Sequence, residues 1–315
     1  MSDALQFRAV RKAYGRRGPP ALDGLTWRAP RGAIVGLVGA NGAGKTTAFG
    51  VAAGYLQPDA GDVVVLGATG FDVWRLKGRF GILPQDAELP DRQSPRALLT
   101  HLARLQGLAD PQRAAARVLA EVQLSDRLDA AVSTLSHGMR RRVAVATALL
   151  GEPELILLDE PMSGLDPAQA AHLREVLSSR RGRATLVVSS HDLVALERLC
   201  DHVVFLVGGR CVREGAVDAV AGRDEVARWT LSRPPDLARL IAAAPDASLR
   251  WDGQVLEQRA RGGASLDAGA LQLMAALAQE GTAVRAIQRG DGFEQRFFEQ
   301  ERGASRAVSR PASDR

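Results

Sequence analysis

Short apolar runs alternate with stretches of helical periodicity along the first two thirds of the chain. Runs of this kind predict strands at residues 25–29, 33–38, 63–66, 80–83, 155–158, 185–189 and 203–207. Strands that alternate with helical stretches are typical of an α/β domain. We therefore expect an α/β core over about residues 5–221.

Residues 94–150 depart from this alternation, because they contain no apolar run of the strand type. Leu98, Leu102 and Leu105 recur at helical spacing, and Asp110 followed by Pro111 favours the start of a further helix. The pattern predicts a helical insert, about residues 86–150, inside the α/β core.

The composition changes after Gly222. Apolar runs predict strands at residues 227–231, 249–251, 255–259 and 284–288, and residues 268–279 have the pattern of a helix. Residues 302–315 are rich in Arg, Ser, Ala and Pro, which favours disorder. We expect one domain over residues 1–222, a small C-terminal α+β domain over 223–300 and a disordered tail over 301–315.

Hydrophobic residues make up 46% of the 315 positions and charged residues 24%, which is ordinary for a globular protein. No apolar run approaches the roughly 20 residues of a membrane-spanning helix. The first six residues lack the basic and apolar regions of a secretion signal. The two cysteines and five histidines show no metal-ligand spacing, so we expect reduced thiols and a location in the cytoplasm.

The formal net charge of +5 is compatible with binding to nucleic acid or to an anionic membrane surface. Lysine occurs only at Lys12, Lys45 and Lys77, while arginine is abundant throughout, which indicates a general preference for arginine. No stripe of aromatic and basic residues accompanies the charge. We therefore expect no nucleic-acid partner.

A phosphate-binding motif of the form G-x-x-x-x-G-K-[ST] follows the predicted strand 33–38 and precedes a helical stretch. Glycines there let backbone N–H groups surround a phosphate, and the helix N-terminus adds partial positive charge. Lys45 is expected to reach the β- and γ-phosphates, and the Thr46 hydroxyl to ligate Mg²⁺. The predicted nucleotide-binding residues of this motif are Gly39, Asn41, Gly42, Gly44, Lys45, Thr46 and Thr47.

The apolar run 155–158 ends in two acidic residues, Asp159 and Glu160. Ligands bind at the carboxyl ends of strands in open α/β sheets, which places Asp159 beside the metal. Glu160 follows immediately and is suited to polarise an attacking water. Together with the Lys45 motif, this pair predicts a nucleoside-triphosphate hydrolase.

The helical insert ends in the sequence Leu-Ser-His-Gly-Met-Arg-Arg-Arg, and here the chain resembles the ABC ATPase family. The signature loop of that family usually reads Leu-Ser-Gly-Gly-Gln. Ser136 and Gly138 match it, whereas His137 and Met139 depart from it. A Ser-x-Gly-Met form is familiar among cassettes that serve ABC-2-type membrane partners. Ser136 would cap a helix whose N-terminus faces the γ-phosphate held by the opposite subunit, while His137 is interpreted as a residue of loop shape.

Four further residues occur in the order of the family's motifs. Tyr14 resembles the aromatic residue that stacks on adenine, although a single aromatic near an N-terminus also fits simple packing. Gln85 resembles the loop residue that links the metal to the helical insert. Asp166 resembles the inter-subunit loop that follows the catalytic Glu, and His191 resembles the switch histidine that contacts the γ-phosphate.

The resemblance implies a P-loop NTPase core of the ABC-cassette type with an inserted helical subdomain. It implies ATP and Mg²⁺ as cofactors, with Glu160, His191 and Gln85 in catalysis and Thr46, Gln85 and Asp159 at the metal. It also implies two copies that enclose two ATP molecules head to tail, although a similar second protein could replace one copy. A membrane-spanning ABC permease, a separate chain, would dock near Gln85. The chain would then lie peripherally at the cytoplasmic face of the inner or plasma membrane.

The subtype and the function each have alternatives. Residues 292–299 resemble a degraded form of the Leu-Glu-Asp-x-Phe segment of ABC-2-type exporter cassettes, but Phe293 and Phe297 could equally fix a terminal helix to its sheet. An ATPase of the same superfamily that acts on DNA or ribosomes is one rival. It is disfavoured by the short insert, the single cassette and the lack of a cysteine cluster. A regulatory protein with an inactive cassette is disfavoured by the presence of Lys45, Asp159, Glu160 and His191.

Overall fold

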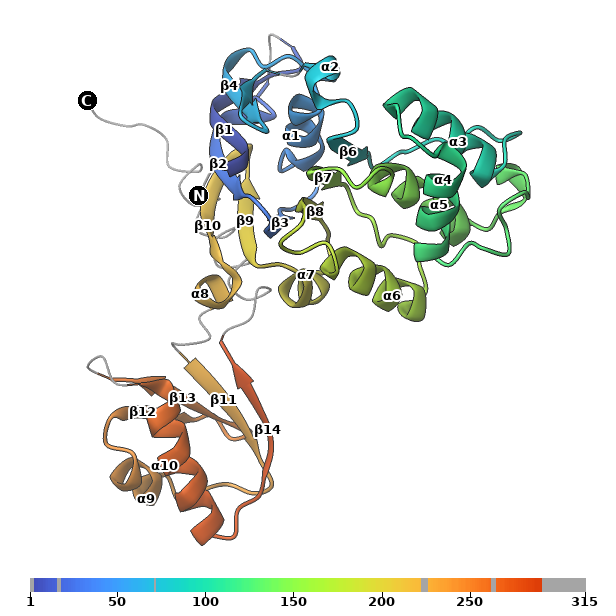
Figure 1. The fold of residues 1–315 in the computed structure, drawn as a ribbon. Coiled ribbons are helices and arrows are strands. Elements are labelled where there is room, and N and C mark those ends of the chain that lie inside the picture. Colours follow the sequence, from blue (N-terminus) through green and yellow to red (C-terminus); the bar gives the residue numbers. More distant parts are fainter. Residues whose placement is uncertain (1–2, 16–17, 71, 222–225, 262–264, 291–315) are drawn as a thin grey trace, which may run out of the picture. The chain divides into compact units, whose positions relative to one another are not determined.

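The computed structural model describes residues 3–15, 18–70, 72–221, 226–261 and 265–290, and the chain divides into two units, Met1–Glu214 and Gly215–Arg315 (Figure 1). The predicted tail 301–315 and the exporter-like segment 292–299 lie outside the described residues. The two units are described separately below.

The first unit contains a six-stranded sheet in the order β10-β9-β3-β8-β7-β6. Its strands are β3 (Ile34–Val38), β6 (Phe80–Leu83), β7 (Leu155–Leu158), β8 (Thr185–Ser189), β9 (His202–Val207) and β10 (Arg210–Ala216). The neighbours from β9 through β3, β8 and β7 to β6 all pair in parallel. Every residue of β3, β7 and β8 is buried, as in a parallel sheet that helices cover. Because these strands are parallel, their carboxyl ends meet at one edge of the sheet.

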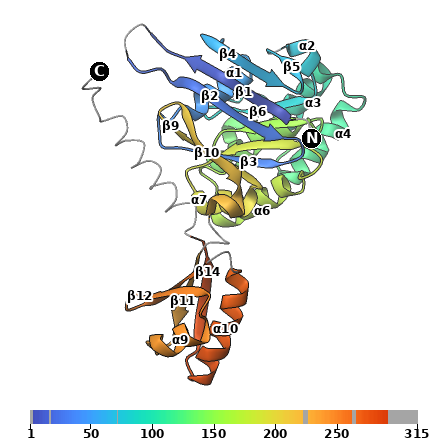
Figure 2. The same cartoon turned by 90° about the vertical axis from the view of Figure 1, so that its left-hand side faces the viewer.

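A second, antiparallel sheet in the order β2-β1-β4-β5 lies in the same unit (Figure 2). Its strands are β1 (Asp3–Lys12), β2 (Leu22–Pro30), β4 (Ala60–Val65) and β5 (Ala68–Thr69). Phe7 and Trp27 stack across it with ring centroids 5.1 Å apart. The predicted strands omit β1 because its alternation is interrupted: Ala9 has a positive φ and the register with β2 shifts between Phe7 and Val10.

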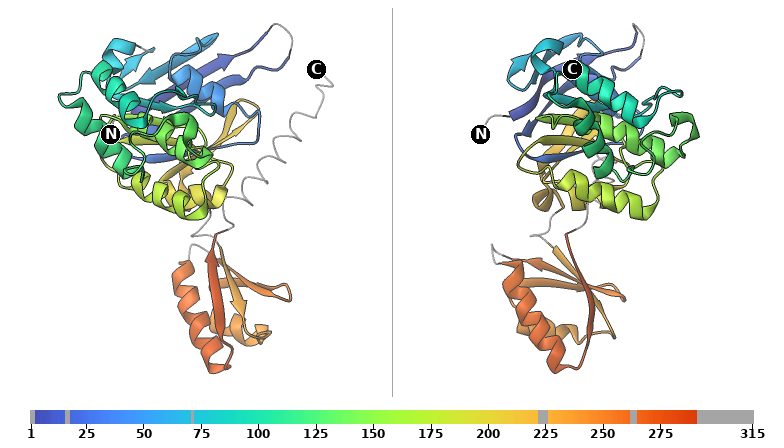
Figure 3. Two further views of the ribbon diagram at one scale, coloured as in Figure 1. Left: turned by 90° about the vertical axis from the view of Figure 1, so that its right-hand side faces the viewer. Right: turned by 45° about the vertical axis from the view of Figure 1, so that its right-hand side comes forward.

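The helices of the first unit cover the six-stranded sheet and form the insert. They are α1 (Lys45–Ala52), α2 (Val73–Leu76), α3 (Pro95–Gln106), α4 (Pro111–Glu121), the 3₁₀ turn Val132–Thr134, α5 (His137–Leu149), α6 (Pro167–Ser178) and α7 (Leu193–Leu199). Helices α3, α4 and α5 pack together, and α5 contacts β6 and β7 (Figure 3). The predicted absence of strands between residues 94 and 150 is confirmed.

The helix that the spacing of Leu98, Leu102 and Leu105 predicts is confirmed as α3. Helix α3 buries Leu98, Leu99 and Ala103, whereas Leu105 is 57% exposed. The start of the next helix at Asp110 is confirmed, because Asp110 Oδ1 accepts a hydrogen bond from the Arg113 amide at 3.0 Å. The leucine spacing thus predicts the helix but not which of its residues are buried.

Gly81 in β6 allows the backbone of α5 to come unusually close to the sheet. A Cβ at this position would lie 2.0 Å from the Ala148 carbonyl oxygen, and Gly81 has no positive φ that would add backbone strain. The conflict is therefore purely steric, and it lies against backbone rather than a flexible side chain. The close approach fixes α5 beside β6, the strand that leads to Gln85.

We expect Gly81→Ala to lower the free energy of unfolding by about 1–3 kcal/mol, because α5 must move away from β6. Urea denaturation followed by tryptophan fluorescence measures the change. Gly15→Ala is the matched control, since a Cβ there meets no atom within 4 Å. Equal midpoints for the two variants would contradict the steric interpretation.

The second unit is a small α+β structure. It contains α8 (Val217–Ala221), β11 (Val226–Leu231), α9 (Leu237–Ala243), β12 (Ala247–Trp251), β13 (Val255–Ala260), α10 (Leu266–Gln279) and β14 (Val284–Arg289). Its antiparallel sheet has the order β12-β13-β11-β14, and α9 and α10 pack on one face of it (Figure 1). The four predicted strands and the predicted long helix are confirmed within two residues at each end, and α9 was not predicted. Within the described ranges, no helix has the length and apolar content to cross a membrane.

Candidate functional site

The loop between β3 and α1 curls at the carboxyl edge of the six-stranded sheet. Lys45 Nζ donates to the Gly39 carbonyl at 2.6 Å and to the Ala40 carbonyl at 3.2 Å. Gly44 has a φ of 104°, and a Cβ there would lie 2.5 Å from the Ala21 carbonyl oxygen, so only glycine fits. Burial lowers the pKa of Lys45, while the nearby negative charges of the β7 end oppose that shift.

Three predicted metal-site residues from three different elements meet beside this loop. Thr46 Oγ1, in the first turn of α1, donates to Asp159 Oδ2 at 2.8 Å and lies 3.3 Å from Gln85 Oε1. Asp159 follows β7 and Gln85 follows β6, which pair in parallel. A hydroxyl, an amide oxygen and a carboxylate are hard oxygen donors of the kind that Mg²⁺ prefers. The residues present therefore fit a magnesium ion.

The Asp159 side chain is 1% exposed and is held by Ser189 at the end of β8. Ser189 Oγ donates to Asp159 Oδ1 at 2.5 Å and accepts from the Glu160 amide at 2.9 Å. One buried hydroxyl thus fixes both acidic residues. Ser189 was not predicted as a site residue, because a serine at the end of a strand carries no motif.

Glu160 adopts a backbone conformation that residues other than glycine rarely take. Its φ is +52°, in the left-handed region, where a residue with a side chain stores roughly 1–3 kcal/mol of strain. The Glu160 carbonyl accepts hydrogen bonds from the Ser163 amide at 3.0 Å and from Arg141 Nη2 at 2.9 Å. Its carboxylate Oε2 lies 2.9 Å from His191 Nδ1. The strained turn therefore points the carboxylate towards the predicted switch histidine.

A cavity of about 480 Å³ collects most of the predicted nucleotide-binding residues. Tyr14 stands at this cavity with 68% of its surface exposed, and its hydroxyl lies 3.2 Å from Thr47 Oγ1. An exposed aromatic ring beside a phosphate loop suits stacking on a base. The cavity is lined by Tyr14, Ala21, Asn41, Gly42, Gly44, Lys45, Thr46, Thr47, Gln85, Asp159 and Glu160.

Ser136, Gly138 and Asp166 are absent from the described lining of this cavity. Ser136 caps α5, its side chain accepting from the Met139 amide at 3.2 Å, and Asp166 caps α6, accepting from the Gln169 amide at 2.9 Å. The His137 ring packs on the loop that precedes α6, because a Cβ at Gly164 in that loop would lie 2.5 Å from the ring. Within one chain, these residues therefore lie outside the described lining of the Lys45 cavity.

The comparison with protein families supports this arrangement. The family model described as ABC transporter matches residues 22–163. The Nod factor export ATP-binding protein I of Paraburkholderia xenovorans (strain LB400) is 37% identical over 225 residues, which cover 69% of this chain and 72% of that protein. The linearmycin resistance ATP-binding protein LnrL of Bacillus subtilis (strain 168) is 30% identical over 235 residues, which cover 72% of this chain and 75% of that protein.

Solved structures show the same fold. The structure described as the ATP binding subunit of an ABC transporter has a TM-score of 0.63 and 28% identity, and the match covers 69% of this chain and 91% of that one. A dimeric post-hydrolysis state of an ATP-binding cassette bound to ADP and Pi has a TM-score of 0.63 at 21% identity, with coverage of 68% and 98%. The residues that match the family model all lie in the first unit.

Proposed function

This chain belongs to the ABC transporter family as an ATP-binding subunit, and from that premise we propose that two copies of it power export through a separate membrane-spanning subunit. As a member of this family the chain is an ATPase. The observation that supports the assignment of the site most strongly is the meeting of Lys45, Thr46, Asp159 and Glu160 at one edge of the six-stranded sheet.

The predicted site residues at the cavity, together with His191 beside it, have distinct tasks in the proposed hydrolysis. Lys45 binds the β- and γ-phosphates, and the backbone amides of its loop surround them. Glu160 orients and polarises the attacking water, while His191, hydrogen-bonded to Glu160, contacts the γ-phosphate. Thr46, Gln85 and Asp159 would hold Mg²⁺, which neutralises phosphate charge when bound. Tyr14 stacks on the base.

The proposed working unit is a head-to-tail pair. Ser136 and Gly138 lie at the N-terminus of α5, where the helix dipole and free amides favour an anion, yet they are absent from the described lining of the Lys45 cavity of their own chain. A second copy, placed by a two-fold axis, brings its own α5 N-terminus and Asp166 to that cavity. ATP then favours the closed pair, and hydrolysis reopens it.

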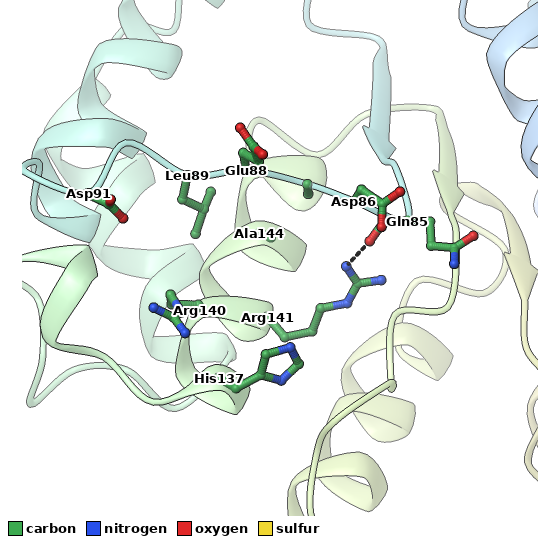
Figure 4. A pocket seen from close by; sticks show the side chains of 10 residues that line it. Gln85, Asp86, Glu88, Leu89, Asp91, His137, Arg140, Arg141 and Ala144 are labelled. Carbon is green, nitrogen blue, oxygen red and sulfur yellow. Dashed lines mark hydrogen bonds between the residues drawn. The ribbon is translucent and has the colours of Figure 1, made fainter.

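A separate groove supports docking of a membrane subunit. It has a volume of about 550 Å³ and lies between the segment after β6 and helix α5 (Figure 4). Asp86, Glu88 and Asp91 give its upper rim negative charge, and the Leu89 side chain points into it. We propose that this groove receives a helix of the permease that carries basic residues, at the cytoplasmic face of the membrane.

The proposed direction of transport, export, rests on the relatives and on the sequence Ser-His-Gly-Met. The Nod factor relative is named as an export protein, and LnrL is named as a resistance protein. The sequence Ser-His-Gly-Met has the Ser-x-Gly-Met form of cassettes that serve ABC-2-type membrane partners.

Affinity purification of tagged Glu160→Gln protein with ATP and Mg²⁺ from detergent-solubilised membranes tests the partner. A polytopic membrane protein is expected in roughly equal amount. We expect Glu88→Lys, added to the same chain, to lose that protein, because it reverses a charge on the groove rim. Glu175→Lys makes the same charge change on an exposed position of α6 and is expected to retain it. Recovery of ribosomes or DNA without a membrane protein would overturn the proposal.

A further inference from the structure

Arg141, in the second turn of α5, extends its side chain to the backbone segments that follow β6 and β7. Its Nη1 donates to the Gln85 carbonyl at 3.0 Å, and its Nη2 donates to the Asp159 carbonyl at 2.5 Å and to the Glu160 carbonyl at 2.9 Å. Figure 4 shows the guanidinium extending from α5 towards the segment of Gln85 and Asp86, with one of these bonds drawn as a dashed line. One side chain therefore binds the backbone of three residues that follow two strands.

The geometry requires the forked shape of arginine. The two arms of a guanidinium lie in one plane and donate in fixed directions, so they can bind two chain segments at once. The carbonyls of Gln85 and Glu160 belong to different loops, and the bond to Glu160 holds the residue that has a positive φ. Without that donor, the strained carbonyl keeps only its bond from the Ser163 amide among the described bonds.

Electrostatics favour a cation in this place. Burial lowers the pKa of Arg141, but the negative charges of Asp159, Glu160 and Asp86 oppose the shift, and a guanidinium stays protonated in any case. The positive charge thus lies behind both acidic residues of the site. It does not lie in the nucleotide cavity, whose described lining excludes Arg141.

We propose that Arg141 is a positioning residue for hydrolysis, fixing the Gln85 loop and the Glu160 turn to helix α5 so that the three move together. The inference rests on the proposed function, because it takes Gln85 and Glu160 as working residues. It also gives α5 a second role. The N-terminus of α5 serves the ATP of the opposite subunit, while Arg141 on the same helix holds the backbone of the Glu160 turn in its own subunit. The helix thereby connects the two ATP sites of the pair.

Steady-state hydrolysis by the purified full-length chain tests this inference. We expect Arg141→Met to lower kcat by about ten- to a hundredfold, the loss that small misplacements of catalytic groups cause, with KM for ATP changed less than about threefold. Arg141→Lys retains the charge but not the fork, and is expected to recover part of the lost rate. Arg104→Met, at an exposed position of α3, is the control and is expected to keep the wild-type rate.

A double variant separates positioning from general damage. If Arg141 acts through the Gln85 loop, Gln85→Ala adds little to Arg141→Met, and the double variant is about as slow as Arg141→Met alone. Multiplicative losses, an unchanged kcat in Arg141→Met, or a parallel loss of kcat and of ATP binding would each overturn the inference. The wild-type rate and its loss in Glu160→Gln test the proposed function separately, so a normal Arg141→Met rate counts against this inference alone.

Discussion

Glu160→Gln is expected to lose at least about a hundredfold of steady-state ATP turnover while ATP affinity stays within about threefold of the wild type. The amide has the shape of the carboxylate and can still bond to His191, so the turn at β7 is kept. It carries no negative charge, however, and cannot accept a proton from the attacking water. Phosphate release measures turnover, and titration with a fluorescent ATP analogue measures binding.

The control for this variant is Glu175→Gln, the same chemical change at an exposed position of α6. It is expected to hydrolyse ATP at the wild-type rate. A second expected sign is that Glu160→Gln forms a lasting dimer with ATP and Mg²⁺, since the step that reopens the pair is blocked. Near-normal turnover in Glu160→Gln would exclude Glu160 as the residue that polarises the water.

Ser136→Arg is expected to lower hydrolysis by at least about a hundredfold and to leave ATP binding by the monomer intact. ATP binding by the monomer is kept because Ser136 caps α5 and is absent from the described lining of the Lys45 cavity. A long side chain at the N-terminus of α5 blocks the approach of the opposite ATP. Ser133→Arg places the same charge at an exposed position of the 3₁₀ turn and is the matched control.

Mixing two inactive chains tests the head-to-tail arrangement directly. A Ser136→Arg chain retains its Lys45 cavity, and a Lys45→Ala chain retains its α5 N-terminus, so a mixed pair has one complete site. An equal mixture is expected to recover about a quarter of the wild-type rate, because random pairing makes half of the pairs mixed. No recovery, or loss of ATP binding in Ser136→Arg, would contradict a role across the interface.

The sequence predicted the strands that carry the site better than it predicted the rest of the fold. Strands β6, β7 and β8 agree with the predicted bounds to the residue. Strands β7 and β8 are fully buried and β6 is buried at alternate positions, and each is a short apolar run in the sequence. Strand β1 escaped prediction because a bulge breaks its alternation. The exposure of Leu105 could not be predicted either, because spacing alone does not give the position of the packing partner.

The site shows the same division. Lys45 and Asp159 belong to motifs that follow strands of the parallel sheet, and Gln85 resembles a loop residue of the family, so all three could be named from the sequence. Ser189 and Arg141 could not. Arg141 is the middle residue of three consecutive arginines, and successive residues of a helix point about 100° apart, so only the packing of α5 decides which of the three faces the Glu160 turn.

The positive φ of Glu160 sets folding and catalysis against each other at a single position. Glycine adopts that conformation without strain, so the fold alone would be served at least as well by a residue with no side chain. In the proposed hydrolysis the Glu160 carboxylate polarises the water, and the φ of +52° gives this side chain a cost in stability. Selection for ATP turnover would therefore favour glutamate at position 160, whereas selection for stability alone would favour glycine. In a related cassette that no longer hydrolyses ATP, we expect this glutamate to be among the first residues replaced.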